Sequence, residues 1–278
     1  MIDFKLIVPN DENDSKNQSN EVYIEFGAGK GLLGLSISMV RPLSTIIMVE
    51  RSGMRRKADK LLREYGRNFH RFRMDIRDVS LCQLPGIDLK NISSPSEKRC
   101  ILVAKHLCGV ATDFALWSFE NLSKEFENNS RGLAIATCCH HACQYHDFYG
   151  KKCISEHGFS RSEFNLMCRW SGWANTYNNS SDDYSKKKDH DQPTSSAPRP
   201  PGLEPSRQSN IGFKIKRIFD YCRVEALKNI GYNCELARFI IIFLLICNLY
   251  SFFFLISILT LLLPIGIAPQ ICRLRIML

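Results

Sequence analysis

Three glycines in the stretch 22–34, VYIEFGAGKGLLG, are spaced for a turn that lets the main chain pass close to a ligand. Gly27, Gly29 and Gly31 follow a short apolar run and precede Leu32, where an apolar helical pattern begins. Glycine tolerates the positive φ angles of such a turn, and the free N–H groups at the start of the helix face whatever lies over it. The stretch therefore predicts a strand, a ligand-binding turn and a helix.

Two glutamates flank this turn at positions that suit a nucleoside cofactor. Glu25 comes just before the glycines, and Glu50 ends the next apolar run, where a carboxylate commonly binds the hydroxyls of a ribose. Gly29, Gly31 and Gly34 also fit the dinucleotide spacing G-x-G-x-x-G, but a carboxylate at Glu25 would repel a pyrophosphate and attract the sulfonium of S-adenosylmethionine. We therefore predict S-adenosylmethionine as the cofactor, with a nicotinamide dinucleotide as the alternative. Cofactor contacts are assigned to Glu25, Gly27, Gly29, Gly31 and Glu50.

The composition favours an intracellular globular protein with an anionic partner. The 278 residues carry 37 Lys and Arg against 28 Asp and Glu, and the formal charge of +9 favours a nucleic acid or a membrane surface. The 12 cysteines lack the regular spacing of a secreted disulfide scaffold, and no N-terminal signal peptide is visible. We expect a nuclear or cytoplasmic protein with free thiols and no obligate protein partner.

Short apolar runs alternate with helical patterns from residue 21 to residue 137. Strands are predicted at Val22–Phe26, Thr45–Glu50, Phe69–Met74, Cys100–Lys105 and Leu133–Thr137. Helices are predicted at Leu32–Met39, Met54–Tyr65 and Thr112–Phe126. This order indicates an α/β fold with a mostly parallel sheet, helices on both faces and ligands at the carboxyl ends of the strands. The core of the fold is predicted over residues 21–177.

Polar residues follow the third and fourth predicted strands, where ligands are expected. Asp75 follows the third strand, and its carboxylate is assigned to the amino group of an adenine, with a helix cap as the alternative. Lys105 and His106 follow the fourth strand, at a position that would face the transferred methyl group. Either could accept a proton from a hydroxyl, because a cationic cofactor lowers the pKa of a lysine and a histidine titrates near neutral pH. Both are assigned as catalytic, and their individual roles are left open.

Six potential metal ligands lie within nine residues after the fifth predicted strand, in CCHHACQYH. The segment alone does not supply a tetrahedral zinc site, because adjacent side chains point apart and structural sites pair spaced ligands with a second cluster. Cys143, Cys153 and His157 could add ligands, but no metal is predicted. The segment is assigned to the substrate side of the cleft through Cys138, Cys139, His140 and His141.

Basic residues concentrate between Arg51 and Arg77. Several of them, Arg55 and Arg56 included, fall on one side of the predicted helix. A solvated helix face is one interpretation. The other is a surface that follows the phosphates of a nucleic acid and binds it in a strongly salt-dependent way, with Arg55 and Arg56 on the substrate.

Three segments flank or interrupt the core. Residues 1–20 are predicted to be a disordered lead-in, and residues 178–210, rich in Ser, Asp, Lys and Pro, a disordered linker or insertion. Residues 211–239 are predicted to return to the core as a basic amphipathic helix, Phe213–Ile230, and a strand.

Residues 240–278 form an apolar tail, in a stretch without charge between Arg238 and Arg273. The stretch is long enough to span a bilayer. Three interpretations are open: a membrane contact through residues 239–268, a non-native tail, or buried sheet or helix of the core.

The motifs EFGAGKG, KHLCGVATD and CCHHACQYHDFYG together resemble those of the eukaryotic tRNA:m4X modification enzymes. That family methylates the ribose 2′-hydroxyl of the fourth nucleotide of the tRNA acceptor stem. The resemblance covers about residues 22–177 and resumes at residues 212–239. It implies a class I, Rossmann-like methyltransferase fold, S-adenosylmethionine as the methyl donor, and tRNAs such as those for proline, glycine and histidine as substrates.

The chain departs from that family at both ends. Family members carry small zinc-binding modules ahead of the catalytic domain, and none precedes Val22 here. The family ends in strands that complete the sheet, whereas this chain runs into the apolar tail at Ile240, so an incomplete sheet is expected. The resulting hypothesis is a tRNA 2′-O-methyltransferase. A catalytically inactive, membrane-tethered RNA-binding protein on the same fold and a nicotinamide-dependent oxidoreductase are the alternatives.

Overall fold

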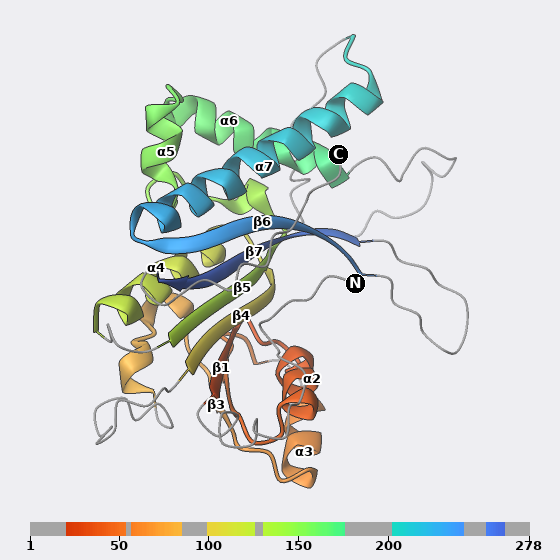
Figure 1. The fold of residues 1–278 in the computed structure, drawn as a ribbon. Helices are drawn as coiled ribbons and strands as arrows, with labels where there is room; N and C mark the ends of the chain where they lie inside the picture. Colours follow the sequence, from red (N-terminus) through yellow and green to blue (C-terminus); the bar gives the residue numbers. More distant parts are fainter. Residues whose placement is uncertain are drawn as a thin grey trace, which may run out of the picture.

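A seven-stranded sheet runs through the computed structural model of the protein, which describes residues 21–53, 57–84, 99–125, 130–175, 202–241 and 254–264 (Figure 1). The strands are β1 Glu21–Phe26, β2 Thr45–Val49, β3 Phe69–Phe72, β4 Arg99–Leu107, β5 Ser130–Thr137, β6 Tyr232–Ile241 and β7 Phe254–Pro264. They lie in the order β3-β2-β1-β4-β5-β7-β6. Neighbours among β1 to β5 pair in parallel, and β7 pairs antiparallel with both β5 and β6. The predicted α/β fold of the class I methyltransferase type is confirmed.

Helices cover both faces of this sheet (Figure 1). The helices are α2 Leu32–Val40, α3 Lys57–Glu64, α4 Val110–Glu125, α5 Lys151–Glu156, α6 Arg161–Ser171 and α7 Pro205–Asn229. Short 3-10 turns lie at η1 Ile76–Asp78, η2 Leu81–Gln83, η3 His140–Ala142 and η4 Gly172–Asn175. The three helices predicted between residues 21 and 137 correspond to α2, α3 and α4, so the alternation of elements is confirmed.

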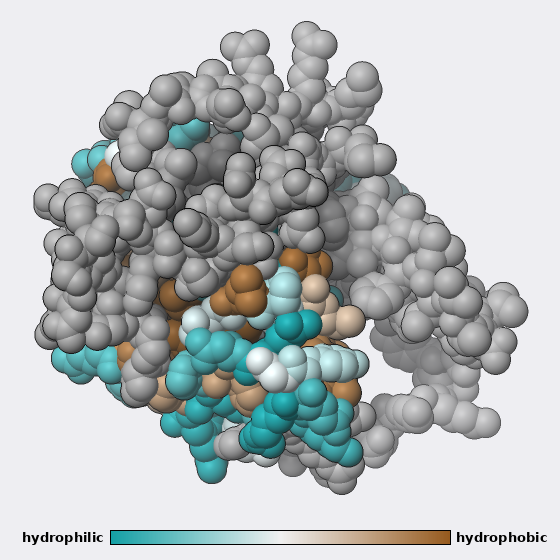
Figure 2. Space-filling view, turned by 60° about the horizontal axis from the view of Figure 1, so that its bottom comes forward, coloured by the Kyte–Doolittle hydropathy of each residue, from teal (hydrophilic) through white to brown (hydrophobic). Residues whose placement is uncertain are grey.

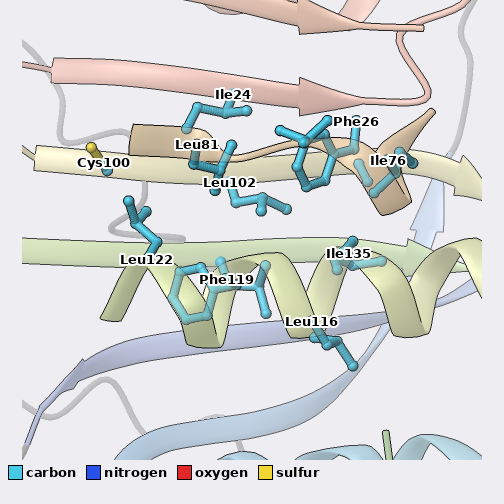
Figure 3. Packing of buried hydrophobic residues seen from close by; sticks show 14 of the residues in the cluster. Ile24, Phe26, Ile76, Leu81, Cys100, Leu102, Leu116, Phe119, Leu122 and Ile135 are labelled. Carbon is cyan, nitrogen blue, oxygen red and sulfur yellow. The ribbon is translucent and has the colours of Figure 1, made fainter. Parts of the chain in front are cut away.

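Strand β1 is buried on both faces and divides the core in two. Ile24 and Phe26 belong to the hydrophobic cluster on the face covered by α4, which also includes Leu116 and Phe119 of that helix (Figure 3). Tyr23 points to the opposite face, into a second cluster with residues of α2 and α3. A strand with apolar side chains on both faces reads as a continuous apolar run, which is how parallel central strands are built.

Helices α5, α6 and α7 form a third hydrophobic cluster, beside the β6 end of the sheet (Figure 1). Phe148, Phe164 and Phe219 form its centre, with ring centroids 4.9–5.4 Å apart. Helix α6 begins with a capping box, in which Ser160 and Glu163 satisfy each other's backbone N–H groups. This cluster fixes α7 against the loop that follows β5.

The apolar tail contributes a strand to the sheet. Strand β7 lies between β5 and β6 and pairs along both of its edges, for example Leu261 with Leu133 and with Cys234. The expectation of a sheet without its final strands is therefore wrong. The pairing places residues 254–264 within the sheet, and the other residues from 242 onward lie outside the described residues.

Most predicted boundaries differ from the observed ones by a few residues at most, and the start of α7 differs by more. Helix α7 begins at Pro205, inside the segment 178–210 that was predicted to be a linker. Proline at the first helical position suits a helix start, because its fixed φ is helical and its missing N–H would have had no partner there. Residues 1–20 and most of the predicted linker lie outside the described residues.

No helix among the described residues is long and apolar enough to cross a membrane.

Candidate functional site

A cavity of about 600 Å³ opens at the carboxyl ends of the parallel strands. Gly27 after β1, Glu50 after β2, Asp75 after β3, Cys108 after β4 and Gln144 after β5 all contribute to its lining. These segments converge because the carboxyl ends of parallel strands all lie at the same edge of the sheet. The predicted location of the ligand site is therefore matched by a cavity.

The glycine turn has the backbone that its sequence predicted. Gly27, Gly29 and Gly31 have φ angles of 64°, 50° and 78°. A β-carbon on Gly27 would lie 3.0 Å from Leu107 Cδ1, and one on Gly31 would collide with the guanidinium of Arg71. The turn therefore requires glycine for its conformation and for the space around it.

Glu50 connects the glycine turn to the loop after β2. Its Oε2 accepts a hydrogen bond from Gly29 N at 2.9 Å, and its Oε1 accepts from Ser52 N and Ser52 Oγ at 2.7 Å each. Partial burial alone would raise the pKa of Glu50, but these hydrogen bonds outweigh burial and lower it. The carboxylate on the cavity wall is therefore ionised at neutral pH, and Oε2, which accepts a single hydrogen bond, keeps a lone pair for a ligand hydroxyl.

Asp75 is a second ionised carboxylate on the cavity wall. It caps the turn η1 by accepting from Arg77 N at 3.1 Å, and its Oδ2 lies 3.2 Å from Arg77 Nη2 and 3.3 Å from Arg51 Nη1. The Arg77 hydrogen bonds lower the pKa of Asp75 to about 2. The two interpretations of Asp75, ligand contact and cap, are compatible, because a capping carboxylate still lines the cavity.

Glu25 does not lie where the sequence analysis placed it. Its side chain points away from the cavity, under α2, where Oε2 accepts from Gly34 N at 2.9 Å, and its exposed fraction is 4%. The described residues that line the cavity do not include Glu25. Burial raises the pKa of Glu25 to about 7. The assignment of Glu25 as a cofactor contact is therefore corrected to a role in positioning the helix that follows the glycine turn.

Arg71 holds the glycine turn through a hydrogen bond to its main chain, and nothing in the sequence assigned it this role. Its guanidinium donates to both carboxylate oxygens of Asp59 in α3, at 2.8–3.0 Å, and to Gly29 O at 3.1 Å. Both members of this ion pair are nearly inaccessible. Arg71 had been counted only among the clustered basic residues. Arg71 lies two residues after Phe69 and so on the same face of β3, which could have indicated an inward side chain.

Lys105 and His106 lie at the end of β4, next to the cavity wall rather than in it. The described residues of this segment that line the cavity are Leu107 and Cys108. His106 has a φ of 60°, at an irregularity in the pairing of β4 with β5. A non-glycine residue in this region is strained, which is a feature of functional sites. Partial burial, and then the charge of Lys105, lower the pKa of His106, so its imidazole is neutral at pH 7.

The loop after β5 is anchored through His140. Nε2 of His140 lies 2.8 Å from Asp220 Oδ1 and its Nδ1 lies 3.1 Å from Cys138 O, with the side chain buried. The assignment of His140 to the substrate side is therefore wrong, because α7 covers it. Cys138, Cys139 and His141 are partly accessible, so their assignment to the substrate side stays a prediction.

Asp220 belongs to a buried ion network that ties α4, α7 and this loop together. Arg223 donates to Asp113 Oδ1 and Oδ2 at 2.9 Å each and to Asp220 Oδ1 at 3.1 Å. Thr137 donates to Asp220 Oδ2 at 2.9 Å, and Tyr149 N donates to Asp113 at 3.2 Å. The network holds the loop after β5, which carries Cys138 and Cys139, through the contacts of Asp220 with Thr137 and His140.

The basic segment divides into an inward and an outward part. Arg71 is buried, whereas Lys60 and Arg63 of α3 are exposed. Figure 2 brings forward the side on which Figure 1 places α3 and shows hydrophilic residues at the lower part of the described surface, with hydrophobic residues above them. Arg55 and Arg56, assigned to the substrate, lie outside the described residues.

The cavity fits S-adenosylmethionine. Its volume of about 600 Å³ is within the range of cofactor pockets, roughly 300–1,000 Å³. Gly27 presents main chain rather than a side chain, Glu50 and Asp75 present ionised oxygens for hydroxyl and amino groups, and Phe114 presents an apolar ring. These are the groups that an adenosyl ligand requires.

A family model described as "Methyltransferase TRM13" matches residues 5–243. A relative from Dictyostelium discoideum, "tRNA:m(4)X modification enzyme TRM13 homolog", is 33% identical over 245 residues, which cover 78% of this chain and 45% of the relative. The protein of the same description from Homo sapiens is 26% identical, with 82% of this chain and 58% of that protein covered. The chain thus spans about half the length of the curated relatives it matches.

Solved structures with a similar arrangement are also methyltransferases by name. The precorrin-6y C5,15-methyltransferase from Geobacter metallireducens has a TM-score of 0.40 at 12% identity, with 92% of this chain and 90% of that chain covered. The plantazolicin methyltransferase BpumL in complex with SAH has a TM-score of 0.38 at 10% identity, with 90% of this chain and 81% of that chain covered. At these scores the likeness carries no argument, and the fold assignment rests on the strand order.

Proposed function

The chain belongs to the TRM13 methyltransferase family, and from that premise we propose that it methylates the ribose 2′-hydroxyl of the fourth nucleotide in a tRNA acceptor stem, with S-adenosylmethionine as the donor. The proposal is supported by the names of its relatives, which describe tRNA:m(4)X modification enzymes. The single observation that carries it is the cavity formed by the glycine turn, Glu50 and Asp75, because it matches an adenosyl ligand. The net charge of +9 suits a polyanionic substrate.

The residues of the chain divide into those that hold the donor and those that act on the acceptor. When bound, S-adenosylmethionine would supply an electrophilic methyl group for the ribose oxygen. Glu50 binds the ribose hydroxyls of the donor, and Asp75 binds the adenine amino group. Either Lys105 or the neutral imidazole of His106 accepts the proton of the attacking hydroxyl. Much of the rate comes from alignment of the two reactants, which the rigid strand ends provide.

Direct transfer tests the proposal. The purified chain is incubated with S-adenosylmethionine and tRNA transcripts, and methylated ribose is mapped by mass spectrometry. Methylation confined to the fourth nucleotide, and lost in a tRNA with 2′-deoxyribose there, is the expected result. The matching cellular measurement is loss of that methyl group in tRNA from cells that lack the protein. A chain that binds tRNA and neither binds nor consumes the donor would instead support a catalytically inactive RNA-binding protein.

Glu50→Gln is expected to weaken S-adenosylmethionine binding by roughly tenfold or more, because hydrogen bonds to a charged acceptor are each worth about 1.5–3 kcal/mol. Isothermal titration calorimetry measures this loss. Glu25→Gln is the matched control, since Glu25 faces α2 and not the cavity, and its affinity should equal that of the wild type. If the two variants lose affinity equally, the assignment of Glu50 to the donor is incorrect.

Lys105→Ala and His106→Ala are expected to separate the two candidates for the base. Removal of a general base lowers turnover by about 10²- to 10⁴-fold. The variant that lacks the base should lose turnover and retain donor affinity, and the other variant should lose little of either. Single-turnover methylation and calorimetry together measure the two quantities. A loss of donor affinity as large as the loss of turnover would contradict a catalytic role for that residue.

A further inference from the structure

Three thiols meet beside the cavity, and the proposed methyl transfer uses none of them. Cys108 follows β4, and Cys138 and Cys139 follow β5. Their three sulfur atoms all lie within 4.8 Å of one another, with Cys108 Sγ 3.1 Å from Cys138 Sγ. Each of the three is at least partly accessible, whereas the other described cysteines are buried.

We propose that Cys108, Cys138 and Cys139 bind a Zn²⁺ ion. Zinc–thiolate bonds are about 2.3 Å long, so two sulfurs of a tetrahedral site lie roughly 3.8 Å apart, a spacing that the cluster meets with small adjustments. The three thiols release their protons to solvent when the ion binds, because thiolate is the ligand form. The cation then neutralises negative charges that would otherwise repel one another at this distance.

The two loops that carry the thiols are fixed before any metal binds. Gly109 packs directly against Ala142, since a β-carbon on Gly109 would collide with that residue. Thr112 donates to Leu107 O at 2.8 Å and holds the end of β4. His140 and Asp220 hold the other loop. A site preorganised in this way does not require a folding step when the ion binds.

The position of the cluster gives the ion an open side. Three described residues supply ligands, and a zinc site with three protein ligands keeps a fourth position for water or another oxygen ligand. Cys108 also lines the cavity, so the ion borders the space assigned to S-adenosylmethionine. The inference needs neither the methyl donor nor tRNA, so it stands or fails separately from the proposed function.

Cobalt(II) substitution tests the site on the full 278-residue chain. The chain is reduced, stripped with a chelator and titrated with Co²⁺ alone. One Co²⁺ per chain is expected, with a thiolate-to-metal charge-transfer band and tetrahedral visible bands that are lost when Zn²⁺ is added. Cys108→Ser, Cys138→Ser and Cys139→Ser should each lose stoichiometric binding. Cys100→Ala, which removes a buried thiol at the opposite end of β4, should retain it.

A second measurement on the wild-type chain does not depend on the folding of variants. Alkylation with iodoacetamide is mapped by peptide mass spectrometry with and without Zn²⁺, and protection of all three thiols is expected. Alkylation at equal rates with and without Zn²⁺ would overturn the proposal. So would a reduced chain that binds less than one metal ion, or a wild-type chain that forms a Cys108–Cys138 disulfide in air and binds no metal after reduction.

Discussion

Glu25→Gln is expected to stabilise the folded chain by about 3 kcal/mol at pH 8 and to leave its stability unchanged at pH 4. The wild-type carboxyl is buried and has a pKa of about 7, against an ordinary value of 4.5. At pH 8 the folded state must therefore hold a buried carboxylate, and the unfolded state exposes the same charge to water. Glutamine avoids that cost and still offers an oxygen to Gly34 N.

The sign of the effect follows from proton binding. Between pH 4.5 and pH 7 the folded chain keeps a proton on Glu25 that the unfolded chain has lost, so the free energy of unfolding falls as the pH rises through this window. Below pH 4.5 both states bind the proton, and above pH 7 neither does. Arg71 partly offsets the cost of the charge, and Glu50 adds to it.

Urea unfolding of the wild type and of Glu25→Gln across this pH range measures the effect. The two curves of unfolding free energy should separate from pH 4.5 to pH 7 and run parallel above it. Glu64→Gln is the matched control, because Glu64 is an exposed glutamate on α3, and its curve should follow the wild type within about 0.5 kcal/mol. Parallel curves for Glu25→Gln over the whole range would show that its carboxyl titrates normally.

The glycine turn shows how much of the fold can be predicted from local sequence. Gly27, Gly29 and Gly31 lie between an apolar run and a helical pattern, and every one of these features depends on residues close in the chain. The alternation of strands and helices is equally local, and it indicates a parallel sheet because parallel neighbours need a long crossover connection, which is usually a helix. The edge at which ligand residues converge follows from that topology.

The direction of a side chain at the end of a strand is harder to predict. Glu25 was assigned to the cofactor by its distance from the glycines, yet it shares the face of Tyr23 and turns under α2. Side chains alternate between the two faces along β1. Because Ile24 and Phe26 lie on the face toward α4, Glu25 between them must point to the opposite face. The prediction rested on the attraction between the Glu25 carboxylate and a cationic cofactor. The alternation of side chains along β1 instead places Glu25 under α2.

Contacts between distant segments could not be predicted from one segment at a time. The cysteines after β5 do not make a metal site among themselves, and the third sulfur comes from Cys108, 30 residues before Cys138. His140 was assigned to the substrate because nothing nearby indicates that Asp220 covers it. Strand β7 has the same difficulty, since an apolar run that pairs within a sheet and an apolar run that spans a membrane have the same composition.

Arg223→Met is expected to lower the free energy of unfolding by about 3–5 kcal/mol, because it leaves the buried carboxylate of Asp113 without its ion-pair partner and removes one of the hydrogen-bond donors to Asp220. Arg223, Asp113 and Asp220 are each at most 1% exposed, so water cannot replace the lost partner. The guanidinium also lies over the Phe148 ring, 5.1 Å from its centroid. Arg217→Met changes an exposed arginine of the same helix and should cost less than about 0.5 kcal/mol.

The double variant Asp113→Asn/Arg223→Met separates the charge effect from lost packing. If the unpaired carboxylate dominates, the second substitution should recover part of the stability lost in Arg223→Met, and the two changes will not be additive. If packing dominates, Asp113→Asn should destabilise further. Hydrogen exchange of residues 138–144 gives a local readout: because Asp220 holds both Arg223 and His140, Arg223→Met should speed exchange in this loop more than in β1. Unchanged exchange there would mean that His140 and Asp220 hold the loop without the arginine.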